Sequence, residues 1–438
     1  MTVSPWRWIP TLYFTQGIPN VVVVTLSVVM FKMLGLGNAE VAFFTSWLYL
    51  PWVIKPLWSP LVDLLGTKRR WIVVLQFVIG AALAMVVLAL PAPQAVQWAL
   101  AVFWLMAFAS ATHDIAADGF YMLALPERTQ AAFVGVRSTF FRLAMITGQG
   151  GLVVLAGWLN ERTGSVVVAW QGVMGALAVG FVLLALWHAV ALPRPQADRP
   201  ARLPSGGPGA LAREFFAVFA AFLRQPGIGR VLAFLLLYRF AEAQLLRLTT
   251  PFLLDPVAEG GLGLKAQDVG VVYGMAGVAA LTVGGLLGGW VIAQVGLKRA
   301  LWPLVLALNV PNAVYIALAL AQPSSLWVLS SAVVVEQFGY GLGFTAYMVY
   351  MLMVASGPDG ANPHKTAHYA LCTGFMALGM MLPGLWAGWL QEQLGYVNYF
   401  IWVCVATVPS FVVAGLIRID PAFGRRQAPA EAAETAPR

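Results

Sequence analysis

The most constraining feature of this sequence is a succession of long apolar runs separated by short polar breaks. Twelve runs hold about 20 or more mostly apolar residues, the length that a helix needs to cross a hydrocarbon layer about 30 Å thick. Only 10% of the residues are charged, against about 25% in soluble domains. The sequence therefore predicts an all-α integral membrane protein with twelve transmembrane helices. The runs lie at residues 8–33, 39–65, 71–90, 97–122, 131–157, 166–190, 228–252, 268–293, 300–321, 326–354, 367–388 and 397–417.

Lysine and arginine are distributed unevenly between the two sets of loops that these helices define. The set that includes both termini holds 18 of the 26 cations, whereas the other set holds only Lys32, Arg162 and Lys265. Because cytoplasmic loops are enriched in Lys and Arg, we expect both termini to be cytoplasmic. The cations form no basic face with interleaved aromatic residues, so nucleic-acid binding is not predicted.

Two sequence motifs occur twice at nearly the same spacing. AGWLNERTG begins at Ala156, and AGWLQEQLG begins 231 residues later at Ala387. The polar break SPLVDLLGTKRR, which begins at Ser59, matches GWVIAQVGLKRA at a shift of 230 residues. One period shared by two motifs indicates a parallel duplication of six helices. We expect an N-terminal bundle in residues 1–192 and a C-terminal bundle in residues 227–418.

The segment between the bundles, residues 193–226, begins with a stretch rich in Pro, Gly and Arg, a composition that cannot bury a core. We expect a flexible cytoplasmic linker that ends in an interfacial helix, because Phe215, Phe219 and Phe222 recur at helical spacing opposite charged residues. Residues 419–438 are expected to form a disordered cytoplasmic tail.

The polar break after the second run resembles the signature of the major facilitator superfamily, G-x-x-x-D-(R/K)-x-G-(R/K)-(R/K). Asp63, Gly66 and Lys68 carry the match, whereas Ser59 replaces the leading glycine. A carboxylate at a helix end beside cations can form ion pairs that hold one conformation and break in the other. The alternative is a basic loop that only fixes topology. The candidate gating residues are Asp63, Lys68, Lys55 and Arg137.

Within that superfamily the sequence resembles the AmpG-like muropeptide permeases of the peptide and acetyl-CoA transporter family. The resembling stretches are HDIAADGFYMLALP in the fourth run, LLLYRFAEAQLLRLTTPFLL in the seventh and AVVVEQFGYGLGFTA in the tenth. The resemblance implies the major facilitator fold, with two pseudo-symmetric six-helix bundles, and import of cell-wall muropeptides across the bacterial inner membrane. It leaves a siderophore open as an alternative cargo. A cavity richer in amide and carboxylate groups than in aromatic rings would favour the muropeptide.

Ionisable residues also occur deep inside the apolar runs, where each costs at least about 2.5–3.5 kcal/mol. Such residues normally face a cavity or a partner, so they are functional candidates by default. They are Lys55, Asp114, Asp118, Arg137, Arg142, Arg239, Glu242, Arg247 and Glu336.

Asp114 and Asp118 are four residues apart and so share one helix face, at about the depth of Arg137 on the next helix. Two carboxylates beside a cation can share or exchange a proton. We hypothesise that Asp114 couples transport to protons and regard Asp118, Glu242 and Glu336 as further candidates. The alternative for Asp118 is an ion pair with Arg137 that locks the fourth and fifth helices together.

In the second half, Arg239, Glu242 and Glu336 fall near the bilayer centre, so they can form a charged cluster. The alternative is an ion pair between Arg239 and Glu336 without a role in transport. Arg142 has no carboxylate at its own depth and is the candidate for bidentate binding of an anionic substrate group.

Other polar side chains complete the predicted substrate site. Pro19 removes a backbone hydrogen bond beside two amide side chains, and such a broken helix is tolerated where it lines a cavity. The alternative is a simple gating kink. Aromatic residues of the tenth run can stack on a sugar ring, although they can equally serve packing. The candidate substrate-binding residues are Arg142, Arg239, Gln16, Asn20, Gln149, Gln337 and Tyr340.

No metal site or cofactor is predicted. His364 and His368 have the i, i+4 spacing of metal ligands, but a catalytic zinc needs three protein ligands and no third lies nearby in the sequence. Cys372 and Cys404 lie in apolar runs and predict no disulfide framework.

The predicted function is a monomeric importer in which two six-helix bundles rock around a midplane site, driven by a proton gradient. Its expected partners are a small-molecule substrate and the lipid bilayer. A membrane enzyme would need His, Asp or Ser groups clustered at one interface, whereas the four His residues are scattered. A cofactor-delivery protein of the same fold is the other alternative.

Overall fold

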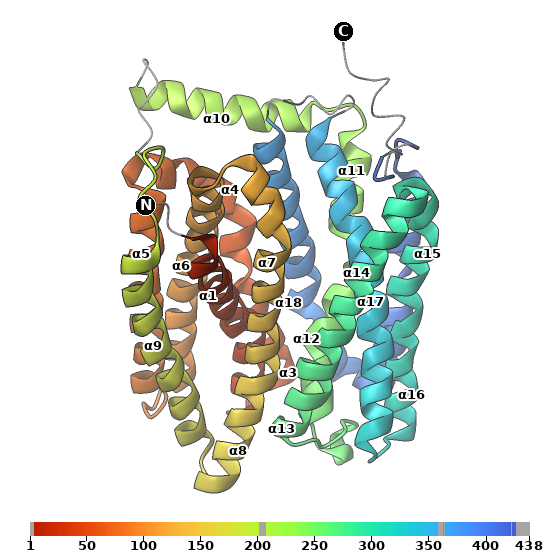
Figure 1. Cartoon of the computed structure of the whole chain (residues 1–438). Coiled ribbons are helices and arrows are strands. Elements are labelled where there is room, and N and C mark those ends of the chain that lie inside the picture. The colour runs from red at the N-terminus through yellow and green to blue at the C-terminus, as the bar shows by residue number, and fades with distance from the viewer. Residues whose placement is uncertain (1–3, 201–206, 358–361, 363, 422, 426–438) are drawn as a thin grey trace.

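The computed structural model describes residues 4–200, 207–357, 362, 364–421 and 423–425. Every regular element within these ranges is a helix. Most helices run side by side along the long axis of the molecule, and α10 (Gly207–Leu223) lies across one end (Figure 1). We call this the linker end. The opposite end, where α8 (Val153–Thr163) and α13 (Ala266–Val269) lie, is called the far end.

The six segments predicted for the first half are helical. After η1 (Pro5–Arg7), they consist of α1 (Ile9–Val21), η2 (Val22–Leu26) and α2 (Ser27–Met33); α3 (Asn38–Trp47) and α4 (Leu50–Leu65); α5 (Lys68–Ala89); α6 (Ala95–Ala124); α7 (Glu127–Ile146), η3 (Thr147–Leu152) and α8; and α9 (Val166–Ala191).

The second half is built in the same way. Its segments consist of α11 (Ile228–Leu237) and α12 (Phe240–Leu254), followed by η4 (Val257–Glu259); α13, η5 (Gly270–Gly277) and α14 (Val278–Val295); α15 (Leu297–Asn309), η6 (Val310–Ala313) and α16 (Val314–Ala321); α17 (Leu326–Ser356); and α18 (Lys365–Val405) with α19 (Val408–Leu416).

Among the described residues, nine helical spans are long and apolar enough to cross a membrane by themselves. The second and seventh predicted segments are not among the nine; in the structure each is divided, between α3 and α4 and between α11 and α12. The last span, Lys365–Leu416, contains both the eleventh and twelfth segments. The chain turns between them at Gly395, whose φ of 70° favours glycine. The predicted all-α membrane fold is confirmed.

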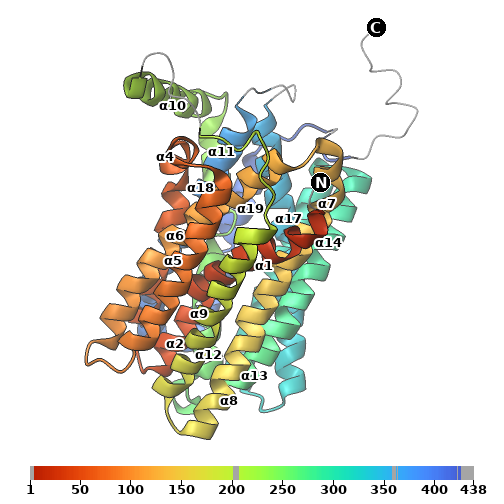
Figure 2. The same cartoon turned by 60° about the vertical axis from the view of Figure 1, so that its left-hand side comes forward.

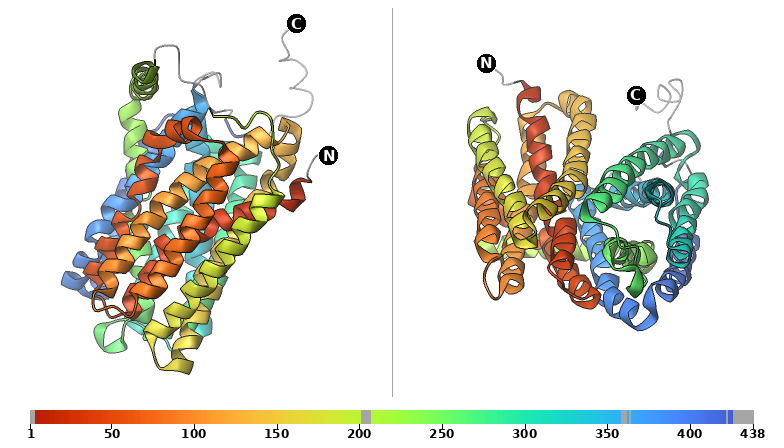
Figure 3. Two further views of the ribbon diagram at one scale, coloured as in Figure 1. Left: turned by 90° about the vertical axis from the view of Figure 1, so that its left-hand side faces the viewer. Right: turned by 90° about the horizontal axis from the view of Figure 1, so that it is seen from below.

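The helices form two groups, which are seen side by side from the far end (Figure 3). The buried apolar side chains follow the same division. Two clusters draw on residues 8–192, with Ala266 as the exception, and two draw on residues 222–414, with Ala42 as the exception. Each half therefore has its own core, as the internal repeat predicts.

The outer surface of the helices is unusually apolar. Along α9, Val179, Leu183, Leu186 and Val190 are between 53% and 74% exposed. Water-soluble monomers rarely expose contiguous apolar surface on this scale. These side chains therefore form a lipid-facing surface.

Part of the predicted flexible linker is anchored to the first half. The Asp198 carboxylate accepts hydrogen bonds from the backbone N–H groups of Lys68 and Arg69 at the start of α5, at 2.7 and 3.0 Å. The helix N-terminus favours such a negative charge. The first residues of the predicted disordered tail are likewise held, because the Phe423 carbonyl accepts from the Leu297 N–H at 3.0 Å. Residues 426–438 lie outside the described part of the chain.

The segment predicted to be an interfacial helix is helical in the structure, as α10, which lies across the linker end (Figure 2). Its Phe222 is fully buried against α18, where it stacks on Phe375, whereas Phe216 is 66% exposed.

The two halves approach each other most closely toward the far end, where glycines allow backbone contact. A Cβ atom on Gly274 of η5 would overlap the backbone of Gln149 in η3, and one on Gly388 of α18 would overlap Asn38 of α3. Gly157 of α8 faces the backbone of Gln267 in α13 in the same way. The halves are therefore in contact backbone to backbone on the far-end side.

We predict that Gly274→Ala lowers the thermal midpoint of the detergent-solubilised protein by a few degrees. The added methyl group must separate η3 from η5, and overpacking of this kind costs about 1–3 kcal/mol. Gly151→Ala is the matched control, since a Cβ at this neighbouring η3 position meets no atom within 4 Å. Equal midpoints for the two variants would contradict the close contact.

Candidate functional site

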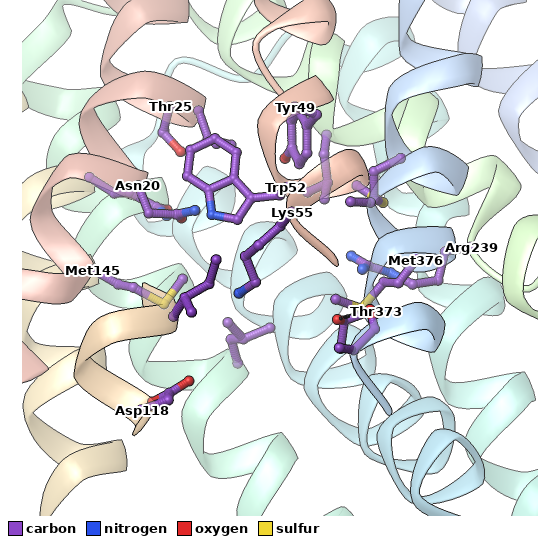
Figure 4. Close-up of a pocket in the computed structure, with 18 of the residues that line it drawn as sticks. Asn20, Thr25, Tyr49, Trp52, Lys55, Asp118, Met145, Arg239, Thr373 and Met376 are labelled. Carbon is purple, nitrogen blue, oxygen red and sulfur yellow. Dashed lines mark hydrogen bonds between the residues drawn. The ribbon is translucent and has the colours of Figure 1, made fainter. Parts of the chain in front are cut away.

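A cavity of about 690 Å³ lies between the two halves. Asn20, Met145 and Lys55 reach it from the first half, and Arg239 and Thr373 face them from the second half (Figure 4). Its lining extends to Lys68 and Thr366, at the first turns of α5 and α18 on the linker side. The cavity therefore extends toward the linker end, whereas the halves are in contact toward the far end.

The lining carries more positive than negative charge. Among the described residues that line the cavity, four are cations and one is a carboxylate. This balance suits a substrate with negative charge. The five residues are Lys55, Lys68, Arg239, Arg247 and Asp118.

Asp114 of α6 lies behind the cavity wall, where α4 supplies two partners. The indole N–H of Trp52 donates to Asp114 Oδ2 at 3.1 Å, and the Lys55 ammonium lies 3.8 Å from the same oxygen. Trp52 and Lys55 are three residues apart and so share a helix face. The ion pair is loose, and its two side chains keep 22% and 14% of their surface exposed.

Asp118, one turn along α6, forms a closer ion pair with Arg137 of α7, at 2.8 Å. The Arg137 guanidinium also lies over the rings of Tyr13 and Tyr121, at 4.5 and 5.0 Å from their centroids. The Tyr13 hydroxyl donates to Asp118 at 3.4 Å. The structure thus contains the alternative for Asp118, an ion pair between the fourth and fifth predicted helices.

In the second half, Arg239 pairs with Glu242 three residues later. Its Nη2 and Nε donate to the two carboxylate oxygens at 2.7 and 3.2 Å. Nη2 also donates to the Tyr340 hydroxyl at 2.6 Å, and the guanidinium lies 4.7 Å from the Phe344 ring centroid. Arg239 is therefore fixed in place by one carboxylate and two aromatic residues.

Glu336 is separate from this cluster. It is buried and accepts hydrogen bonds from the Tyr315 hydroxyl at 3.2 Å and from the Gln337 amide at 2.9 Å. Within the part of the chain that the structure describes, it forms no ion pair, so the alternative of an ion pair between Arg239 and Glu336 is not observed.

The remaining predicted residues divide into two groups. Asn20, Gln149, Gln337 and Tyr340 line the cavity with Arg239, whereas Gln16 is buried outside the lining. Arg142 also lies outside the lining and donates to the Thr282 hydroxyl of α14 at 3.3 Å, across the two halves. The side chain of Asp63 lies outside the described part of the structure.

The structure adds lining residues that the sequence did not single out, among them Tyr49 and Trp52. Both precede Lys55 in the second run, where aromatic residues look like ordinary membrane-facing ones. The sequence identifies Arg247 as an intramembrane charge, but its sequence neighbours do not show that it lines the cavity. Its position in the cavity depends on the packing of α12 against α3 and α18.

A polar cluster joins the two halves on the far-end side, beyond the lining of the cavity, and we call it the far-end latch. Its centre is Asp255, at the end of α12, which pairs with Lys32 at 2.6 Å and accepts hydrogen bonds from Asn38 and Tyr396 at 2.9 and 2.5 Å. Asn38 also donates to Gln391 at 2.8 Å. The latch joins the first half to the second through side chains that are mostly buried.

The profile of the BT1 family matches residues 16–418 of the chain. The chain is also 28% identical over 370 residues to the anhydromuropeptide permease of Escherichia coli (strain K12), a match that covers 83% of this chain and 69% of that protein.

Two solved structures share the fold at low sequence identity. The nucleoside transporter NupG superposes with a TM-score of 0.64 at 17% identity, over 94% of this chain and 98% of NupG. A POT family transporter in complex with 5-aminolevulinic acid superposes with a TM-score of 0.68 at 12% identity, over 93% of this chain and 95% of that protein.

We predict that Asp255→Asn favours a conformation that is open at the far end. Removing one partner of a buried ion pair costs about 3–5 kcal/mol. Here the substitution destabilises the conformation in which the latch contacts are formed. Pulsed electron paramagnetic resonance between spin labels at Arg162 and Val257, with Cys372 and Cys404 replaced, will then show a new population at longer distance.

Glu161→Gln is the matched control for this measurement. It removes the exposed pair between Glu161 and Lys265, 2.7 Å apart at the same end, and exposed pairs contribute little. A distance distribution for Asp255→Asn that is identical to that of Glu161→Gln would show that the latch does not hold the far end closed.

Proposed function

The chain belongs to the BT1 family and is a membrane transporter, and from this premise we propose that it imports cell-wall anhydromuropeptides by proton-coupled alternating access. The anhydromuropeptide permease of Escherichia coli supports this substrate. Among the described lining residues, aromatic and amide or carboxylate side chains are nearly equal in number, so the lining itself does not separate a muropeptide from a siderophore.

The observation that carries the proposal is a cavity between two helical halves that extends to one end and is closed at the other. Such a cavity is what alternating access requires, since the substrate must meet one side of the membrane at a time. The cation-rich loops lie at the linker end, and by the positive-inside rule this end faces the cytoplasm. We therefore propose an inward-facing monomer in the bacterial inner membrane, with both termini cytoplasmic and with residues 1–192 and 227–418 as the rocking units.

Asp114 is the carboxylate that we propose for proton coupling. Its ion pair with Lys55 is loose at 3.8 Å, whereas Asp118 is engaged by Arg137 at 2.8 Å and Glu242 by Arg239 at 2.7 Å. A proton on Asp114 removes the attraction for Lys55, whose side chain already projects into the cavity (Figure 4). Lys55 is then available to an anionic substrate, so a proton and the substrate bind together.

The other candidates keep proposed roles that follow from their positions. Arg239, Asn20, Gln149, Gln337 and Tyr340 line the cavity and can contact the substrate. Gln16 and Arg142 lie outside the lining, so their proposed effect on the substrate is indirect. Glu336 and Glu242 are further proposed proton-coupling residues, in the second half. Lys68, Arg137 and Asp63 are proposed gating residues.

The direct test is uptake by the purified protein in proteoliposomes. With an imposed proton gradient, we expect accumulation of labelled N-acetylglucosaminyl-anhydromuramyl peptide, and no accumulation of a ferric siderophore. The reverse preference would favour the siderophore importer. Absence of accumulation of either solute in active, correctly inserted protein would argue against energised transport and in favour of a cofactor-delivery role.

We predict that Asp114→Asn abolishes accumulation driven by the proton gradient but preserves exchange of labelled for unlabelled muropeptide at equal pH. The neutral side chain mimics a permanently protonated carboxylate, so binding persists while the proton cannot be released. Asp118→Asn is the comparison, since loss of its ion pair with Arg137 lowers stability but leaves uptake dependent on pH. An Asp114→Asn protein whose uptake keeps the pH dependence of the unmodified protein would refute the assignment.

A further inference from the structure

Arg247 of α12 occupies an unusual position between the two halves. Only 5% of the residue is exposed, yet it belongs to the cavity lining. Its Nη1 donates to the Thr45 hydroxyl of α3 at 3.0 Å, and its guanidinium lies 4.7 Å from the centroid of the Tyr49 ring. On the other side it packs against Gly384 of α18, where a Cβ atom would come within 3.1 Å of Nε.

The charge of Arg247 lacks a counter-ion within the described part of the chain. Its Nη2 is buried and has no hydrogen-bond partner. Among the described residues, no carboxylate forms an ion pair with it, in contrast to Arg137 and Arg239, which pair with Asp118 and Glu242. A buried arginine without a counter-ion is costly in a membrane protein, so Arg247 is a candidate for contact with a charged substrate.

We propose that Arg247, together with Tyr49, forms a binding subsite for a carboxylate of the transported substrate. This inference rests on the proposed function and specifies which residue recognises the peptide part of the muropeptide. The unpartnered Nη2 supplies a charge-assisted hydrogen bond to the carboxylate. The tyrosine ring on one side and α18 on the other restrict the guanidinium to one orientation, which favours a directional contact.

The subsite also connects the substrate to the conformation of the protein. Nη1 already bonds Thr45 in the first half, and Nη2 remains for the ligand. A bound carboxylate is therefore held by a side chain that spans both halves. Substrate binding through Arg247 thus favours the conformation in which α3 and α12 are close.

The test measures binding of two labelled probes to the purified, full-length protein. One probe is the anhydromuropeptide with free peptide carboxylates, and the other is the same compound with those carboxylates amidated. We expect the unmodified protein to bind the free acid about tenfold more tightly than the amide, as expected for one charge-assisted hydrogen bond. In Arg247→Gln the two affinities become equal to within about twofold, whereas Arg247→Lys keeps part of the preference.

Thr45→Val separates binding from a structural role of Arg247. This variant removes the bond between the halves and leaves the cation in place, so we expect it to keep the preference for the free acid. If Thr45→Val loses the preference as Arg247→Gln does, Arg247 acts as a structural bridge and the subsite is refuted. An unmodified protein that binds acid and amide equally refutes the subsite but keeps the proposed substrate. An unmodified protein that binds neither probe overturns the proposed substrate and the subsite together.

Discussion

Hydrocarbon offers no hydrogen bonds, and this constraint governs the backbone of the whole molecule. Inside a membrane, each peptide N–H and C=O group must be satisfied within its own segment or by neighbouring protein. The described chain is accordingly helical along most of its apolar runs, and some irregular segments are covered by the other half of the protein. The π-helical segments η3 and η5 illustrate this, because they lie against each other across the two halves at Gln149 and Gly274.

The same constraint acts on charged side chains and explains how the two halves differ. In the first half, two carboxylates one turn apart on α6 have separate cations, Lys55 for Asp114 and Arg137 for Asp118. In the second half, Arg239 and Glu242 neutralise each other at the start of α12. The repeat preserves the helical frame, whereas the ionisable groups have diverged. Arg142 and Arg247 depart from this pattern, because no ion pair with a carboxylate is found for either among the described residues, and of the two only Arg247 lines the cavity.

The far-end latch and the cavity are two consequences of one arrangement. The glycine contacts and the polar cluster around Asp255 bring the halves together on one side, so the helices must separate on the other side. The latch residues come from α2, α3, the end of α12 and α18. Any motion that opens the far end must break these contacts.

The sequence by itself determined the membrane class, the twelve segments, the duplication and the set of buried charges. Hydropathy, run length and repeated motifs are properties of contiguous residues, so they can be read without knowing how helices pack. Even the divided segments were located correctly, although the sequence did not show that α3 and α4, or α11 and α12, are separate helices.

Only the tertiary structure decided which charges meet and which line the cavity. Arg239 pairs with Glu242 instead of Glu336, Arg142 points to Thr282 instead of into the cavity, and Arg247 enters it. Each outcome depends on the rotation of a helix about its axis, and successive residues of a helix differ by about 100° in direction. Depth along the membrane can be counted from the ends of an apolar run, but the facing direction is set by packing between segments far apart in the chain.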